Sequence, residues 1–364
     1  MTLRLPDQNF WKHKKVLVTG HSGFKGSWLV IWLNKLGAVV TGISLDPETS
    51  PNLYSAAKIS TICDSKFINI CNLEKLKKEI LSIQPEVIIH MAAQPLVRRS
   101  YREPINTFEV NMMGTANLLE SIRDCPSVKT VVMITTDKVY KNNEDGEPYS
   151  EEDTLGGHDP YSASKAGAEI VIESYKKSFL EEKNISVSSA RAGNVIGGGD
   201  WSEDRLIPDT IRSWQNNTIL EIRSPHSIRP WQHVLEPLLG YLSLAEDTYH
   251  DSKLCSYYNF GPYKKDIASV KDVIEIARGS LNMHKIEYLD NFQGPHEANL
   301  LFLDTSKSES LLDFKPKWGT QKAVFKTIDW YKNYYEGKSA LSLCEADILD
   351  YEAIFQSDDS RVLN

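Results

Sequence analysis

The sequence predicts an α/β fold in which a doubly wound, Rossmann-type parallel sheet is followed by a smaller, interleaved C-terminal lobe. Three observations support this fold class. Short apolar runs alternate with longer helical stretches through the first half of the chain. A glycine-rich turn follows the first of these runs. Beyond about residue 190 the alternation gives way to irregular sequence that contains prolines and aromatic residues.

Six runs have the composition of buried parallel strands. Each is continuous in hydrophobicity rather than alternating, as expected where helices cover both faces of a sheet. They read KVLVTG, AVVTGIS, KFINI, EVIIHMAA, KTVVMITT and ISVSSAR. Between the first two lies KGSWLVIWLNKLG, which is apolar nearly all round and ends at Gly37. This stretch indicates a buried helix that is capped by a glycine.

Composition and charge exclude several classes of protein. The chain has 364 residues, a net charge of −8 and five scattered cysteines without metal-type spacing. We therefore expect a cytoplasmic protein with reduced thiols and no metal site. The acidic balance argues against a general nucleic-acid or membrane-surface binder. No apolar run approaches the roughly 20 residues that a membrane span needs.

The turn after the first strand, VLVTGHSGFKGSWL, carries Gly20, Gly23 and Gly26. Glycines let the backbone turn tightly and approach a pyrophosphate, whose charge the helix N-terminus stabilises. A plain tight turn is the alternative. The second strand is expected to end at Asp46, where a carboxylate can bind an adenosine ribose and would repel a 2′-phosphate, which favours NAD over NADP. Its alternative role is that of a turn former before Pro47.

Two further stretches carry acid–base chemistry. In DPYSASKAGAE, Tyr161 and Lys165 are four residues apart and share one face of a helix. The ammonium group favours the phenolate, so Tyr161 could accept a hydroxyl proton near neutral pH. The buried strand VVMITTDKVY ends in Thr136, Asp137 and Lys138, polar groups that are costly to bury without partners. The alternatives are an amphipathic surface helix and a surface ion pair at a strand end.

These motifs resemble those of known families. GxxGxxG, HMAAQ, NMMGTANLL and YxxxK together resemble the extended short-chain dehydrogenase/reductase superfamily. TGHSGFKGSWL, TTDKVY, RAGNVIGGGDW, RPWQHVLEPLLGYL, YNFGP and HEANLLFLDTSKS are similar to CDP-glucose 4,6-dehydratases. The resemblance covers about residues 8–340. Its most discriminating parts are the Asp-Lys pair and RPWQHV, which sugar epimerases of the superfamily lack.

The resemblance implies an NAD-dependent lyase acting on CDP-glucose. Bound NAD⁺ would oxidise C4 while Tyr161 takes the hydroxyl proton and Thr136 bonds the same oxygen. Elimination of water across C5 and C6 would follow, with hydride return to C6. Asp137 is the expected general acid. Lys138 is the expected base, or a stabiliser of the enolate, and it must be neutral to abstract a proton.

The resemblance also implies two sets of binding residues. The dinucleotide set is Gly20, His21, Gly23, Phe24, Gly26, Asp46, Asn69, Ile70, Ala92, Ala93, Gln94, Tyr161 and Lys165. At position 69, relatives usually carry Asp rather than Asn. The nucleotide-sugar set is Asn194, Arg205, Arg229, Trp231 and His296. Each residue of the second set has a structural alternative, such as a place in the core for Trp231.

We expect the following organisation of domains. An NAD-binding domain covers residues 1–191, to which 229–260 return. A nucleotide-sugar lobe covers 192–228 and 261–340, and an acidic tail covers 341–364. Family members assemble as dimers or larger oligomers, so a homodimer or homotetramer is expected.

Three other functions compete with this interpretation. A nucleotide-sugar 4-epimerase would share Tyr161 and Lys165 but has no need of Asp137 and Lys138. A 4,6-dehydratase for another nucleotide of glucose would share the whole set, because cytidine is implied by the resemblance alone. A catalytically silent sugar-nucleotide binding protein would not need Thr136 beside the Tyr-Lys pair.

Overall fold

The computed structural model describes residues 4–143, 146–281, 285–289 and 301–362. At its centre lies one seven-stranded sheet in which every neighbouring pair is parallel. Its strands span Lys15–Thr19 (β1), Val39–Ser44 (β2), Asp64–Phe67 (β3), Val87–His90 (β4), Thr130–Ile134 (β5), Ser186–Ala192 (β6) and Tyr257–Phe260 (β11). Their order is β11-β6-β5-β4-β1-β2-β3, which confirms the predicted doubly wound fold.

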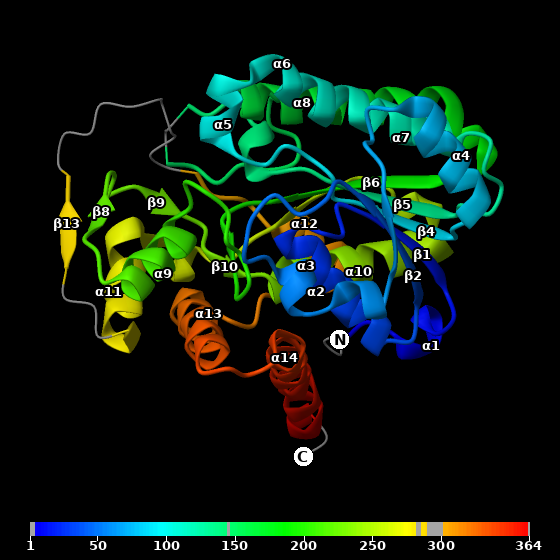
Figure 1. Cartoon of the computed structure of the whole chain (residues 1–364). Helices are drawn as coiled ribbons and strands as arrows, with labels where there is room; N and C mark the ends of the chain where they lie inside the picture. Colours follow the sequence, from blue (N-terminus) through cyan, green and yellow to red (C-terminus); the bar gives the residue numbers. More distant parts are fainter. Residues whose placement is uncertain (1–3, 144–145, 282–284, 290–300, 363–364) are drawn as a thin grey trace.

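Helices cover both faces of this sheet (Figure 1). On one face lie α4 (Leu73–Ile83), α5 (Val97–Arg102), α6 (Pro104–Phe108), α7 (Gly114–Ile122) and α8 (Pro160–Tyr175). On the other lie α1 (Gln8–Trp11), α2 (Phe24–Lys35), α3 (Leu53–Ala56), α10 (Leu235–His250) and α12 (Ser306–Leu312). Strand residues therefore bury side chains in both directions: Val16 and Val18 pack in one hydrophobic cluster and Leu17 in the other.

Two predicted elements can be compared closely with the structure. The apolar helix is α2, whose Trp28 and Trp32 have no solvent exposure, and Gly37 follows it with φ +85°. The glycine cap is thus confirmed. The strand expected over 66–70 was misplaced, because β3 covers residues 64–67 instead. It is an edge strand that pairs only with β2, and its residues are half-exposed or exposed, so its hydrophobic pattern carries little information.

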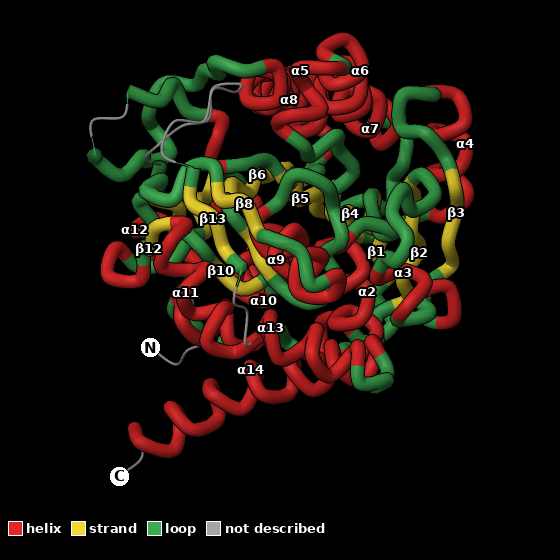
Figure 2. Tube along the Cα trace, turned by 60° about the vertical axis from the view of Figure 1, so that its left-hand side comes forward, coloured by secondary structure: helices red, strands yellow, loops and turns green. Residues whose placement is uncertain are grey.

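The C-terminal part adds a group of shorter elements at one side of the sheet (Figures 1 and 2). Two small pairs are β8 (Leu220–Ile222) with β13 (Ile286–Tyr288), and β9 (Ile228–Arg229) with β12 (Ala268–Ser269). A third pair, β7 (Val195–Ile196) with β10 (Gln232–His233), lies just beyond β6. The helices of this part are α9 (Leu206–Asn216), α11 (Val270–Leu281) and α13 (Thr320–Tyr335).

The acidic tail forms a helix, α14 (Ala340–Val362), that contacts α2 and α13. Among its described side chains, Ala340, Cys344, Ile348, Tyr351 and Phe355 are buried within the main hydrophobic cluster. The tail therefore covers the chain's own core. Within the described residues, no helix combines the length and the apolar character needed to cross a bilayer.

Candidate functional site

The carboxyl ends of the central strands open into a cleft of about 1500 Å³. Its walls come from the turns after β1 to β6 on one side and from α9, β8 and β9 on the other. A crevice at this edge, where the strand order reverses, is where open α/β sheets bind ligands. Every predicted site residue that the structure describes lines this cleft, except His21. His296 lies outside the described residues.

The glycine-rich turn is shaped to receive an anion. Gly20 has φ +76°, and a Cβ there would lie 2.8 Å from the Ala92 nitrogen. A Cβ on Gly26 would lie 2.1 Å from the Gly20 oxygen. Gly23 caps α2 without a side-chain hydrogen bond, so the first backbone N–H groups of this twelve-residue helix have no side-chain acceptor. These groups fit a pyrophosphate, as the glycine spacing predicts.

Two residues of the predicted dinucleotide set, His21 and Asp46, are placed differently from the expectation, and Asn69 makes a local hydrogen bond. The ring of His21 is buried against Gly42 of β2, where a Cβ would come within 2.2 Å of it, so its side chain points away from the cleft. Asp46 lines the cleft rim and is exposed, two residues beyond the end of β2 rather than on the strand. Asn69 lines the cleft, and its amide oxygen accepts one hydrogen bond, from the Cys71 N–H at 2.9 Å, which leaves its second lone pair for a ligand.

The loop after β4 is fastened to the helix that carries the Tyr-Lys pair. Asn111 Oδ1 accepts from the Gln94 N–H at 2.8 Å, and its Nδ2 donates to Ser164 Oγ at 2.8 Å. Ser164 in turn donates to the Tyr161 carbonyl at 2.7 Å. Asn111 lies in the short π-helical segment Glu109–Met113, one place where the sequence motif NMMGTANLL has a visible structural role.

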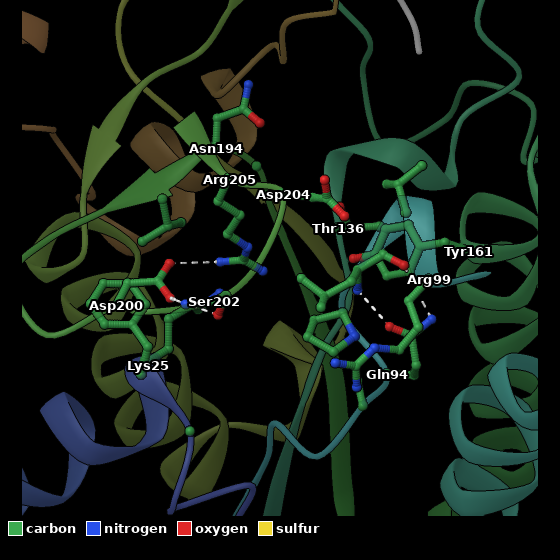
Figure 3. A pocket seen from close by; sticks show the side chains of 18 of the residues that line it. Lys25, Gln94, Arg99, Thr136, Tyr161, Asn194, Asp200, Ser202, Asp204 and Arg205 are labelled. Atoms are coloured by element: carbon green, nitrogen blue, oxygen red, sulfur yellow. Dashed lines mark hydrogen bonds and ion pairs between the residues drawn. The ribbon is translucent and has the colours of Figure 1, made fainter. Parts of the chain in front are cut away.

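Thr136, Asp137 and Lys138 form a tight turn at the end of β5 (Figure 3 labels Thr136). Asp137 has no solvent exposure, and its Oδ1 accepts from Thr136 Oγ1 at 2.9 Å. Lys138 Nζ lies 3.6 Å from the same oxygen. Asp137 Oδ2 has no hydrogen-bond partner among the described residues. Gly193 makes room for this carboxylate, because a Cβ at that position would lie 1.8 Å from Oδ2.

Tyr161 and Lys165 stand on α8 beside this turn, and both are buried. Burial raises the pKa of Tyr161 to about 12, although a hydrogen bond to Thr136 lowers it in part. The pKa of Tyr161 is therefore raised rather than lowered, because the loss of hydration dominates. Burial lowers the pKa of Lys165 to about 8, against the opposing effect of Glu169. Its Nζ donates to the Ile134 carbonyl at 3.2 Å.

The structure adds Lys25, which was not among the site residues predicted from the sequence. It lies inside the glycine-rich turn, lines the cleft, and donates to the Tyr241 hydroxyl at 3.1 Å. Burial, then the charges of Lys165 and Arg205, lower its pKa to about 7. The sequence did contain a signal for this residue. A lysine between Gly23 and Gly26, at the start of a buried helix, is unusual and therefore indicates a functional role.

The predicted nucleotide-sugar residues come from two parts of the cleft wall. Asn194 follows β6, whereas Arg205 directly precedes α9 and Arg229 ends β9 (Figure 3 labels Asn194 and Arg205). Asn194 has φ +46°, and its buried Nδ2 has no partner among the described residues. Arg205 pairs with Asp200 at 3.1 Å. Arg229 Nη1 donates to the Ile228 carbonyl at 3.0 Å. Trp231 is 7% exposed and belongs to the hydrophobic core as well as to the cleft wall, so its structural alternative holds at least in part.

The arrangement brings two kinds of chemistry to one strand end. A phenol and an ammonium group can exchange the proton of a substrate hydroxyl. In the neighbouring turn after β5, the buried carboxylate of Asp137 can protonate a departing group, and the amine of Lys138 can remove a proton from carbon.

Comparisons with known proteins give consistent matches. Residues 17–327 match the family model described as GDP-mannose 4,6 dehydratase. The chain is 44% identical over 351 residues to CDP-glucose 4,6-dehydratase of Salmonella typhimurium, which covers 95% of this chain and 98% of that protein. It is 27% identical to the dTDP-D-glucose 4,6-dehydratase of Mus musculus over 90% of this chain and 91% of that one.

Two solved structures share the fold. DesIV, a dTDP-glucose 4,6-dehydratase from Streptomyces venezuelae with NAD and TYD bound, has a TM-score of 0.76 at 24% identity, over 90% of this chain and 99% of that one. A UDP-glucose 4-epimerase from Thermotoga maritima with UDP-glucose has a TM-score of 0.74 at 20% identity, over 88% of this chain and 99% of that one. The fold is thus shared by dehydratases and epimerases.

Proposed function

The chain belongs to the GDP-mannose 4,6 dehydratase family, and we propose that it converts CDP-D-glucose to CDP-4-dehydro-6-deoxy-D-glucose as an NAD-dependent hydro-lyase. The observation that carries the proposal is 44% identity to a CDP-glucose 4,6-dehydratase over 95% of the chain. The buried carboxylate of Asp137 beside Tyr161 supports a dehydratase rather than a 4-epimerase, because epimerisation at C4 requires no acid at C6.

The cleft suits a dinucleotide. NAD⁺, when bound, would supply the acceptor for the C4 hydride and the hydride that returns to C6. The N–H groups at the start of α2 hold the pyrophosphate, and the carboxylate of Asp46 accepts from a ribose hydroxyl. Ile70 and the loop that contains Ala92, Ala93 and Gln94 line the remaining wall.

Oxidation at C4 requires that a hydroxyl proton leave. Tyr161 accepts this proton while Thr136 bonds the same oxygen and keeps it in line. The phenol is held neutral by burial in the free protein, with a pKa of about 12. A positive charge brought beside it lowers this pKa, and Lys165 holds the helix to the strand end through its bond to the Ile134 carbonyl.

Elimination requires an acid and a base on neighbouring carbons. Once C4 is a ketone, the proton on C5 becomes acidic because the carbanion is stabilised by the carbonyl. Asp137 donates a proton to the departing C6 hydroxyl from its unpartnered Oδ2. Lys138, a quarter of whose side chain is exposed, removes the C5 proton or stabilises the enolate.

The turn after β6 and the wall from α9 and β9 hold the nucleotide sugar in this proposal. Arg205 and Arg229 meet the diphosphate, and Asn194 presents its unpartnered amide N–H. We also propose that the chain is divided into a dinucleotide-binding part (1–191 with 229–260) and a nucleotide-sugar lobe (192–228 and 261–340).

We also propose a cytoplasmic homodimer or homotetramer. Three large apolar side chains are exposed on the outer helical layer around α8: Ile105 (79%), Met113 (56%) and Ile170 (63%). Light scattering of the purified protein and of Ile170→Lys tests the assembly. A dimer or tetramer that the variant converts to a monomer is expected, and a monomeric wild type contradicts this part.

The activity is tested by incubating the protein with CDP-glucose and NAD⁺ in deuterated water, followed by mass spectrometry. A product lighter by one water that carries one solvent deuteron is expected, since C5 is reprotonated from solvent. An unchanged mass with a new C4 configuration identifies an epimerase. Turnover of another nucleotide of glucose, without turnover of CDP-glucose, overturns only the cytidine assignment.

A further inference from the structure

The backbone N–H groups of the catalytic turn form only long hydrogen bonds within it. Within Thr136–Val139, the Lys138 N–H donates to Thr136 Oγ1 at 3.4 Å, and the Val139 N–H donates to the Thr136 carbonyl at 3.4 Å. Both distances exceed the usual range of about 2.7 to 3.2 Å. The 2.9 Å bond from Thr136 Oγ1 to Asp137 Oδ1 ties the carboxylate to its neighbour in the turn, so the position of both within the fold depends on what flanks the turn.

Both flanks lead to one buried ion pair. Thr135, which precedes the turn, donates from Oγ1 to the Glu169 carboxylate at 2.5 Å. Tyr140, which follows the turn, accepts on its hydroxyl oxygen from Arg191 Nη1 at 2.9 Å. Arg191 and Glu169 bind each other through two bonds of 2.9 and 3.1 Å, with side chains that are 1% and 0% exposed.

The same pair touches the rest of the site. Glu169 is one helical turn beyond Lys165 on α8, and its charge opposes the desolvation of that lysine. Lys165 itself donates to the carbonyl of Ile134, next to Thr135. Helix α8, strand β6 and the end of β5 thus meet at a pair that does not line the cleft.

A buried ion pair is an expensive way to stabilise a fold. Apolar side chains of similar size often serve as well or better, because two charges must lose their hydration. The hydrogen bonds to Thr135 and Tyr140 are what an apolar pair could not provide. We propose that Glu169 and Arg191 are positioning residues that clamp both ends of the catalytic turn, an inference that rests on the proposed roles of Asp137 and Lys138.

The clamp is best tested at its two ends. Replacing Glu169 alone would strand a buried arginine and destabilise the whole protein. Thr135→Val and Tyr140→Phe each remove one hydroxyl and leave the pair intact. Ser189→Ala is the matched control, because Ser189 donates to the same Glu169 carboxylate at 2.8 Å but from β6, away from the turn.

We expect each end variant to lower kcat by about tenfold and the double variant by about 100-fold, since misplacing a catalytic group by 1 Å can cost that much. KM for CDP-glucose should change by less than about threefold, because neither Thr135 nor Tyr140 belongs to the proposed nucleotide-sugar set. Ser189→Ala should match Thr135→Val in loss of melting temperature but keep kcat within about twofold of wild type. A kcat loss in Ser189→Ala equal to that in Thr135→Val, or end variants that lose only stability, would refute the clamp.

Crystal structures of the double variant and of Ser189→Ala separate this inference from the activity itself. A displaced Asp137 carboxylate in the double variant only is expected. If wild type fails to dehydrate CDP-glucose, the proposed function is wrong, while the position of Asp137 still decides whether the pair is a clamp. An unmoved carboxylate in the double variant overturns it.

Discussion

Gly193→Ala should disable the enzyme without unfolding it. Gly193 directly follows β6, and its missing side chain is the space that the Asp137 carboxylate occupies. An added Cβ would lie 1.8 Å from Oδ2, 2.1 Å from Cγ and 2.5 Å from Oδ1 of Asp137. Because carbon and oxygen atoms seldom approach closer than about 3.3 Å, the carboxylate must move by about 1.5 Å.

The size of the effect follows from this displacement. A shift of that order in a group that must protonate a departing hydroxyl lowers kcat by about 100-fold or more. Gly193 is not among the glycines with positive φ, so alanine adopts its backbone without strain. The cost in folding free energy is that of overpacking, about 1 to 3 kcal/mol.

Steady-state kinetics with CDP-glucose and saturating NAD⁺ measures kcat, and urea unfolding measures stability. Gly261→Ala is the matched control, since Gly261 follows the neighbouring strand β11 and a Cβ there would meet only ordinary contacts at 3.8 Å. It should retain the kcat of wild type. A Gly193→Ala variant that keeps kcat within about threefold would refute the assignment of Asp137 as the essential acid.

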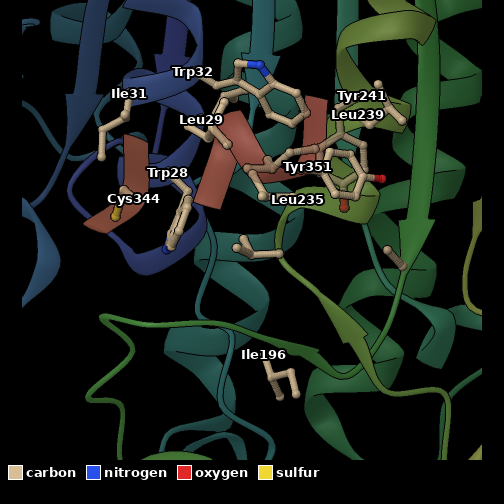
Figure 4. Packing of buried hydrophobic residues seen from close by; sticks show 14 of the residues in the cluster. Trp28, Leu29, Ile31, Trp32, Ile196, Leu235, Leu239, Tyr241, Cys344 and Tyr351 are labelled. Atoms are coloured by element: carbon tan, nitrogen blue, oxygen red, sulfur yellow. The ribbon is translucent and has the colours of Figure 1, made fainter. Parts of the chain in front are cut away.

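Three further changes test other parts of the molecule. Tyr161→Phe should lower kcat, measured by steady-state kinetics with saturating NAD⁺, by about 10²- to 10⁴-fold, because the proton acceptor is lost; a kcat within about threefold of wild type would contradict that role. Burial raises the pKa of Glu236 from 4.5 to about 7, so the folded state binds more protons in that window and wild type loses stability as the pH rises through it. In Glu236→Gln, the unfolding free energy should fall by up to about 3 kcal/mol less than in wild type between pH 4.5 and 7, as measured by urea unfolding at several pH values. If its dependence on pH is the same as in wild type, Glu236 does not titrate in this range. Tyr351→Ala, in α14 against Trp32 (Figure 4), should cost about 3 to 5 kcal/mol of unfolding free energy, whereas a loss below about 1 kcal/mol would mean that the tail does not complete the core.

Local patterns of the sequence were enough for the fold class, the glycine-rich turn and the Tyr-Lys pair. Continuous apolar runs mark strands that are covered on both faces, and a spacing of four residues puts Tyr161 and Lys165 on one side of α8. Family resemblance extended this to Asp137 and Lys138. All of these features depend on residues that are close in the chain, where geometry is set by the helix or strand period.

Tertiary structure alone decided how those groups are held and charged. Gly193 is distant in sequence from Asp137, and Arg191 from Tyr140, so no periodicity relates them. His21 was expected in the cleft, but its ring packs against Gly42 of β2, where the absence of a side chain leaves room for it. The pKa of Tyr161 likewise depends on burial by several elements at once, and the loss of hydration there exceeds the lowering that the hydrogen bond to Thr136 brings.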